Sequence, residues 1–208
     1  MSDKRETRDV EIDSVEIREG GATMIAGHAA VFDKLSQDLG GFREKIAPGA
    51  FQRSIDKAPK ADIYALWQHQ SDKPLGRAGN GTLRLIEDKR GLAVEIDPPA
   101  TSWGADALAS VKRGDTKHFS FGFEVLKDAW DFTDPKNVIR TLQDVRLIEV
   151  SPVTFPAYPQ TSAEARATVA EINKRNGESV DALSRAQKDA QARASLEARV
   201  RVAEIELS

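Results

Sequence analysis

Histidine side chains are the usual proton carriers near neutral pH, and this chain has three of them. His69 closely follows the apolar run ADIYALW and opens a polar segment that contains Pro74 and Gly76. A rigid strand that runs into such a loop can present a side chain to a cleft. His69 is therefore the first candidate for a general base.

Ser120 is the hydroxyl group whose surroundings suggest chemistry. It lies in the strand-like segment HFSFGFEV, where the flanking phenylalanines would point to the opposite face of the strand. Taken alone, such a serine is an ordinary strand residue. Gly122 favours a functional role for Ser120, because a glycine inside a strand marks a bulge or a close approach of another backbone.

His118 and His28 are the competing bases. His118 precedes Ser120 by two positions, so both side chains would lie on the same face of a strand. However, a same-strand ring lies beside the serine rather than across from it, and no third group is evident that would orient the ring. His28 lies in MIAGHAAVF, a strand pattern in which a histidine commonly packs or hydrogen-bonds at a sheet edge.

Glu149 is the acidic residue that could orient a base. It lies between two aliphatic residues in a strand pattern that looks buried, and a buried carboxylate needs a partner. Arg146 or Arg77 could supply an ordinary ion pair. In the functional interpretation, Glu149 accepts a hydrogen bond from His69 and fixes the tautomer that can take a proton from Ser120.

The first half of the chain predicts strands with one short helix. Apolar and polar residues alternate from Val10 to Phe32 around Gly20-Gly21, which is typical of a hairpin. Apolar residues at helical spacing predict a short helix over AFQRSIDKA, ending before Pro59. Further strands are expected over ADIYALW, TLRLIED and GLAVEID, with QHQSDKPLGR as a loop after the first.

The second half predicts a helix, two longer strands and a tail. Ser102 is expected to cap the helix WGADALASVKRG, which ends at Gly114. The segments HFSFGFEVL and VIRTLQDVRLIEVSPVTF suit a sheet or barrel. We expect a flexible N-terminus over residues 1–9, one domain over 10–163, and a charged, alanine-rich tail over 164–208 that is helical or partly disordered. A coiled coil that binds itself or a partner is an alternative for the tail.

The composition limits the classes of function. Apolar residues make up 40% and charged residues 30%, which is in the globular range, and the net charge of −3 argues against binding to nucleic acid. The absence of cysteine excludes disulfides and thiolate metal sites. A metal hydrolase built on His28, His69 and carboxylates is a weak alternative, because no two histidines are at i, i+4 spacing. We expect no cofactor, no metal and no membrane association.

Six segments, taken together and in order, resemble the prohead protease family of tailed bacteriophages over about residues 10–163. They are IAGHAAVFD, KIAPGAFQRSI, LWQHQSDKPLGR, RGLAVEID, KRGDTKHFSFGF and LIEVSPVTFPAYP. That family is similar in fold to the herpesvirus assemblins. The resemblance implies an α+β fold, mainly an antiparallel β-barrel with a few surrounding helices.

The same match puts the family's histidine, serine and acidic residue on His69, Ser120 and Glu149. The implied activity is that of a serine endopeptidase with a Ser-His-Glu triad. Its implied substrates are the scaffold, the major capsid protein and the protease itself, inside the assembling prohead in the host bacterial cytoplasm, and a homo-oligomer is a further expectation. His118 stands where family members often have a smaller or aliphatic residue, so it is a candidate modifier of the site.

The competing hypothesis from another class is a non-enzymatic capsid assembly or scaffold protein. In that interpretation the helical tail does the work, the triad-like residues are structural, and Ser120 takes no covalent label. The sequence also leaves the donors to an oxyanion open between backbone N–H groups and an arginine such as Arg77 or Arg146.

Overall fold

The computed structural model describes residues 5–10, 16–19, 23–58, 62–134, 136–155 and 174. The chain divides into two compact units, residues 1–163 and 164–208. All described residues except Lys174 belong to the first unit, so the rest of the expected helical tail lies outside the described residues.

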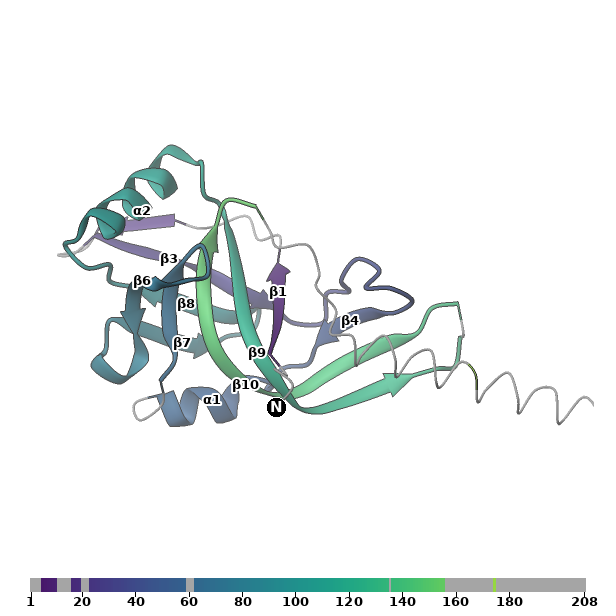
Figure 1. Ribbon diagram of the computed structural model, residues 1–208. Helices are drawn as coiled ribbons and strands as arrows, with labels where there is room; N and C mark the ends of the chain where they lie inside the picture. The colour runs from purple at the N-terminus through teal and green to yellow at the C-terminus, as the bar shows by residue number, and fades with distance from the viewer. Residues whose placement is uncertain are drawn as a thin grey trace, which may run out of the picture. The chain divides into compact units, whose positions relative to one another are not determined.

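The larger of two sheets is built around a pair of long, curved strands, β9 and β10, which run antiparallel (Figure 1). Its strand order is β1-β9-β10-β5-β6, and β4 pairs with β10 off this path. The sheet therefore has β1 at one edge and β6 at the other. The strands are β1 (Glu6–Val10), β4 (Arg43–Ile46), β5 (Tyr64–Trp67), β6 (Gln70–Arg77), β9 (His118–Asp131) and β10 (Ile139–Val153).

The smaller sheet is antiparallel throughout, with the order β2-β3-β8-β7. The described residues also form two α-helices and one short 3₁₀ turn. These elements are β2 (Glu16–Glu19), β3 (Thr23–Val31), α1 (Gln52–Lys57), η2 (Ala78–Asn80), β7 (Leu83–Glu87), β8 (Gly91–Ile96) and α2 (Ser102–Arg113).

The fold class is α+β, as expected, because sheet dominates and helices are few. The pairings among the described strands link them into two open sheets and do not close a barrel. The barrel and the similarity to assemblins therefore stay predictions.

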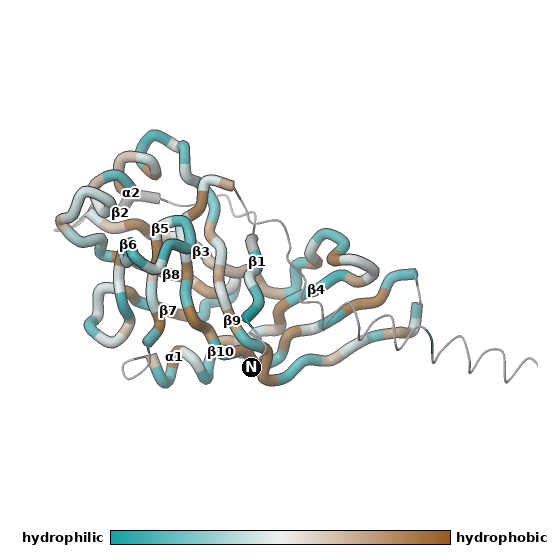
Figure 2. Tube along the Cα trace, in the orientation of Figure 1, coloured by the Kyte–Doolittle hydropathy of each residue, from teal (hydrophilic) through white to brown (hydrophobic). Residues whose placement is uncertain are grey.

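The core fills with side chains from both sheets and from the two helices. Hydrophobic segments run along the central strands (Figure 2). The phenylalanines of β9 lie on one face and are fully buried, with Phe121 at 5.0 Å from Phe123 and 5.5 Å from Phe51 between ring centroids. Burial of each such side chain stabilises the fold by about 2 kcal/mol. This packing anchors the strand whose other face carries Ser120.

Most expected elements are present, with three differences. The helix α2 ends at Gly114, which has a φ of 81°, but its cap is Thr101, whose hydroxyl accepts from the Gly104 N–H, rather than Ser102. The segment predicted as a loop after β5 is instead the strand β6. Its Pro74 is tolerated because β6 is an edge strand and the register shifts there.

The third difference concerns the N-terminus, where a flexible segment is expected up to residue 9. Residues 6–10 form the strand β1, which pairs antiparallel with β9. Its alternate side chains Glu6 and Arg8 are buried charges, a pattern that gives no hydrophobic periodicity for sequence reasoning to detect.

Candidate active site

His69 lies in a tight turn between two strands of the larger sheet. Gln68 and His69 are the two residues of the turn between β5 and β6, and both have left-handed φ angles, 54° and 61°. This combination is a hairpin turn that usually contains glycine or asparagine, so the side chains here are held at a conformational cost. The Gln68 side chain donates to Thr154 at 2.8 Å, which fixes the turn against the end of β10.

Glu149, in the C-terminal half of β10, is 1% exposed and is hydrogen-bonded to the His69 ring. Its Oε1 is 2.8 Å from His69 Nδ1 and accepts from Arg5 Nη2 at 2.9 Å, while its Oε2 accepts from the Ser151 hydroxyl at 2.6 Å. An ionised carboxylate only accepts hydrogen bonds, so the ring's hydrogen is assigned to Nδ1. His69 Nε2 is then the nitrogen with a lone pair, as a general base requires.

Gly122 provides the room for this carboxylate. A β-carbon at this position would lie 2.8 Å from Glu149 Oε1 and 2.9 Å from Arg5 Nε. The register between β9 and β10 also shifts between Leu147 and Glu149, so a bulge sets Glu149 opposite the glycine. The bulge expected near a glycine inside a strand occurs here, whereas the groups that approach Gly122 closely are side chains rather than another backbone.

Ser120 lies on the same face of the sheet as Glu149. Ser151 is opposite Ser120 and Glu149 is opposite Gly122, so these residues alternate along one surface of the two strands. The Ser120 side chain is fully buried, and its hydroxyl donates to the backbone oxygen of Arg8 at 3.1 Å.

The structure thus gathers the three expected site residues onto one face but does not hydrogen-bond Ser120 to His69. His69 Nε2 is buried and has no hydrogen-bond partner in the described part of the chain. Glu149 is hydrogen-bonded to His69, whereas the Ser120 hydroxyl is hydrogen-bonded to the backbone of β1. A proton relay from serine to histidine therefore needs the Ser120 hydroxyl to turn away from Arg8.

The other candidates from the sequence have separate partners. His28 is in the smaller sheet and its Nε2 is 2.8 Å from Asp88 Oδ2. His118 makes no hydrogen bond to Ser120, and its Nδ1 is buried without a partner among the described residues.

The two arginines proposed as partners for Glu149 are elsewhere. Arg77 pairs with Asp62 at 2.6 Å, and Arg146 pairs with Glu124. The ion-pair prediction for Glu149 with either of them is therefore wrong. The arginine that Glu149 does contact is Arg5.

Sequence reasoning missed Ser151 and Arg5 as neighbours of the site. Ser151 could have been found, since it is two residues after Glu149 in a strand and must share its face. Arg5 gives no such signal, because only the pairing of β1 with β9 carries it to Glu149.

The described residues contain no group of three or more histidine, aspartate or glutamate side chains able to hold a metal. His28 and His69 are in different sheets, each with its own carboxylate. No described helix is long and apolar enough to cross a membrane.

Comparison with protein families gives a match to the model for caudovirus prohead serine proteases over residues 8–175. The chain belongs to this family. Searches of curated proteins and of solved structures give no match. The family membership implies a serine peptidase that acts in capsid maturation, on capsid proteins, within the assembling phage head in the host cytoplasm.

Proposed function

We propose that the protein is an endopeptidase that processes the scaffold, the major capsid protein and itself during prohead maturation, with Ser120, His69 and Glu149 as its triad. The observation that carries this proposal is the 2.8 Å contact between His69 Nδ1 and the buried Glu149, with the far nitrogen of the ring left unpartnered in the described residues. Such a pair fixes the tautomer that can accept a proton from a serine on the same face.

Each residue has a defined role in this mechanism. His69 Nε2 removes the proton of the Ser120 hydroxyl as the oxygen attacks a peptide carbonyl, and the ring then delivers the proton to the leaving amine. Glu149 stays ionised and stabilises the charged ring. Its two oxygens accept hydrogen bonds from Arg5 and Ser151, which hold the carboxylate in place beside the ring.

The remaining parts of the proposal follow from the family. An assemblin-like fold, a homo-oligomer and self-processing within residues 164–208 are included here as expectations. Because Arg77 and Arg146 are engaged with other carboxylates, backbone N–H groups are the better candidates for stabilising an oxyanion.

The test is mass spectrometry of the wild-type protein and its Ser120→Ala variant, each co-expressed with the capsid protein encoded beside it. We expect trimming of the capsid protein and of the protease only with Ser120 present. Circular dichroism of the variant controls for folding. Trimming by a folded Ser120→Ala protein would refute the nucleophile, and identical uncleaved masses would favour the non-enzymatic scaffold alternative.

A further inference from the structure

Strand β1 lies beside the nucleophile at the edge of the sheet. It runs antiparallel to β9, with Asp9 opposite Ser120 in the register. The Ser120 hydroxyl donates to the carbonyl oxygen of Arg8. The peptide bond beside the proposed nucleophile is therefore the one between Arg8 and Asp9.

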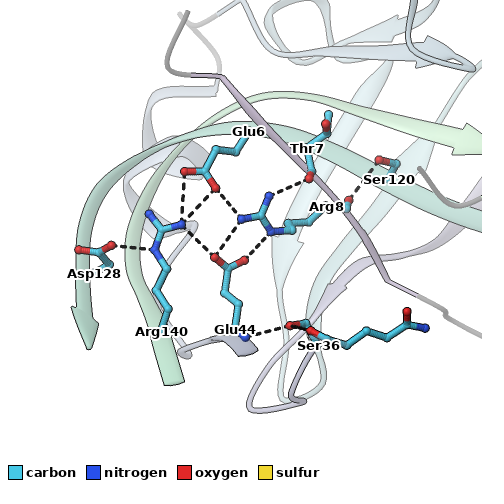
Figure 3. Close-up of polar contacts among 9 residues, drawn as sticks. Glu6, Thr7, Arg8, Ser36, Glu44, Ser120, Asp128 and Arg140 are labelled. Atoms are coloured by element: carbon cyan, nitrogen blue, oxygen red, sulfur yellow. Dashed lines mark hydrogen bonds and ion pairs between the residues drawn. The ribbon is translucent and has the colours of Figure 1, made fainter. Parts of the chain in front are cut away.

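The Arg8 side chain lies in a buried cluster of charged side chains, called the charged pocket below, which Glu44 and Arg140 form with it and Glu6 (Figure 3). Its Nε and Nη2 donate to the two oxygens of Glu44 at 2.7 and 3.1 Å, which is a bidentate contact. The guanidinium also lies 5.5 Å from the centre of the Phe123 ring. Arg8 and Glu44 are 6% and 3% exposed, so this pair is almost completely removed from solvent.

Glu6, two residues earlier on β1, fits the other half of the same pocket. Its Oε2 accepts from Arg140 Nη1 at 3.1 Å and from Arg8 Nη2 at 2.5 Å. Burial opposes the charge of Arg140, but the neighbouring Glu44 and Glu6, with a hydrogen bond to Asp128, raise the pKa of Arg140. Figure 3 shows Glu6 and Glu44 bridging the two guanidinium groups.

The pocket is complementary to a strand that carries both charges. The body of the domain contributes Glu44 and Arg140, and β1 contributes an acid and a base at alternate positions. Burying one charge without its partner is strongly unfavourable, so a peptide with a neutral side chain in place of either would bind less well. Main-chain pairing at a sheet edge combined with pockets for alternate side chains is a common way to bind extended peptides.

We propose that β1 occupies the position of a substrate strand, and that Glu44 and Arg140 select peptides with arginine directly before the scissile bond and glutamate two residues before that arginine. This inference rests on the proposed protease function. It assigns a substrate class to the site, namely extended peptides of the type Glu-x-Arg.

The chemistry follows from the position of the carbonyl. In a bound substrate, Ser120 Oγ attacks the arginine carbonyl carbon, the bond to the next nitrogen breaks, and His69 transfers the serine proton to that nitrogen. A water molecule then attacks the acyl-enzyme, which releases the arginine carboxylate and restores the serine. The protein's own β1 competes with any substrate for this position.

Peptide binding to a protein that cannot cleave tests the pocket separately from catalysis. The full-length protein carries Ser120→Ala to prevent cleavage and Arg8→Gln to weaken its own β1. The probe is a fluorescent peptide of residues 4–13, KRETRDVEID, followed by anisotropy. We expect the peptides with Arg8→Gln or Glu6→Gln to bind at least about tenfold more weakly than the original. Equal binding of all three peptides overturns the inference, and this comparison changes only the peptide.

A protein variant locates the preference. Glu44→Gln should reduce the ratio of affinities for the original and Arg8→Gln peptides to about threefold or less. Glu95→Gln, which alters an ion pair in the smaller sheet, should keep the ratio and serves as the matched control. A ratio unaffected by Glu44→Gln overturns the assignment of the pocket.

Cleavage separates this inference from the proposed function. The Arg8→Gln protein with Ser120 intact should cut the original peptide after its arginine, as read from product masses. If cleavage depends on Ser120 but occurs at other residues, and binding is not selective, the pocket assignment is refuted while the proposed protease function stands. Selective binding without cleavage supports the pocket and counts against the protease.

Discussion

His28 and His69 each contact a carboxylate across 2.8 Å, but the two pairs differ in their surroundings. The carboxylate of Asp88 is 43% exposed, whereas that of Glu149 is 2% exposed. His28 is itself more buried than His69, at 17% against 26%. The distance and the burial of the ring therefore do not distinguish a structural histidine from a candidate base.

The surroundings of each carboxylate make the distinction. Asp88 accepts from the backbone N–H groups of Arg90 and Gly91 and so closes the turn between β7 and β8. Burial is the largest single influence and raises its pKa, but the hydrogen bonds from Gly91, His28 and Arg90 together outweigh it, so the pKa of Asp88 is lowered. Glu149 instead contacts His69 from within the sheet, beside the strand that carries Ser120, where water screens the pair less.

The largest expected contrast comes from removing each ring. His69→Ala should lower kcat for capsid-protein cleavage by on the order of 10⁶-fold, because the serine loses its base. His28→Ala should leave kcat unchanged, since its pair is remote from Ser120. Cleavage rates of the purified proteins on one capsid precursor measure both. An equal loss in the two variants would refute the distinction drawn here.

Neutralising Glu149 should lower kcat, whereas neutralising Asp88 should not. Glu149→Gln keeps the shape but loses the charge that holds the Nδ1 tautomer, so kcat should fall by about 10⁴-fold. Asp88→Asn should have no effect on kcat. Steady-state kinetics with matched thermal melts separates catalysis from folding. Wild-type kcat in a Glu149→Gln protein would remove Glu149 from the triad.

A methyl group at position 122 should have an intermediate effect. Gly122→Ala pushes the Glu149 carboxylate by a fraction of an ångström to about 1 Å, and such a displacement can cost about 100-fold in kcat. Gly79→Ala is the control, because its added β-carbon would meet nothing closer than 3.4 Å. If both alanine variants cleave at the wild-type rate, the tight fit around Glu149 has no role in catalysis.

The smallest effect is expected at His118. It shares a strand with Ser120 but makes no hydrogen bond to it, so His118→Ala should reduce kcat by less than about tenfold. The same cleavage assay measures it. A loss as large as that in His69→Ala would mean that His118 is the base.

Local pattern predicted the central parts of this molecule. Alternation around Ser120 correctly put the phenylalanines on the face opposite the serine, and Gly114 correctly marked the end of α2. Strands and helices can be recognised from the periodicity of apolar residues, which depends on residues that are close together in the sequence. The sequence also placed Ser120 and Glu149 in strands and His69 just after the end of a strand, as the structure has them.

Contacts made across the sheet could not be predicted in this way. Arg5 and Glu149 are 144 positions apart, and the choice of Arg5 over Arg77 or Arg146 depends on the register of β1 with β9. The strand β1 was itself hidden, because its buried residues are charged and pair with Glu44 and Arg140, far along the chain. Similarly, Pro74 indicated a loop, and only the edge position of β6 allows it in a strand.

The most direct test of the central claim is covalent labelling of the serine. Ser120 is buried and its hydroxyl is bonded to β1, so a fluorophosphonate is applied to the full-length protein both as wild type and with Arg8→Gln. The adduct is located by peptide mass mapping. We predict an adduct on Ser120 in the Arg8→Gln protein that disappears when His69→Ala is added and remains when His28→Ala is added. An adduct on another residue, or labelling of Ser120 that is independent of His69, would contradict the account.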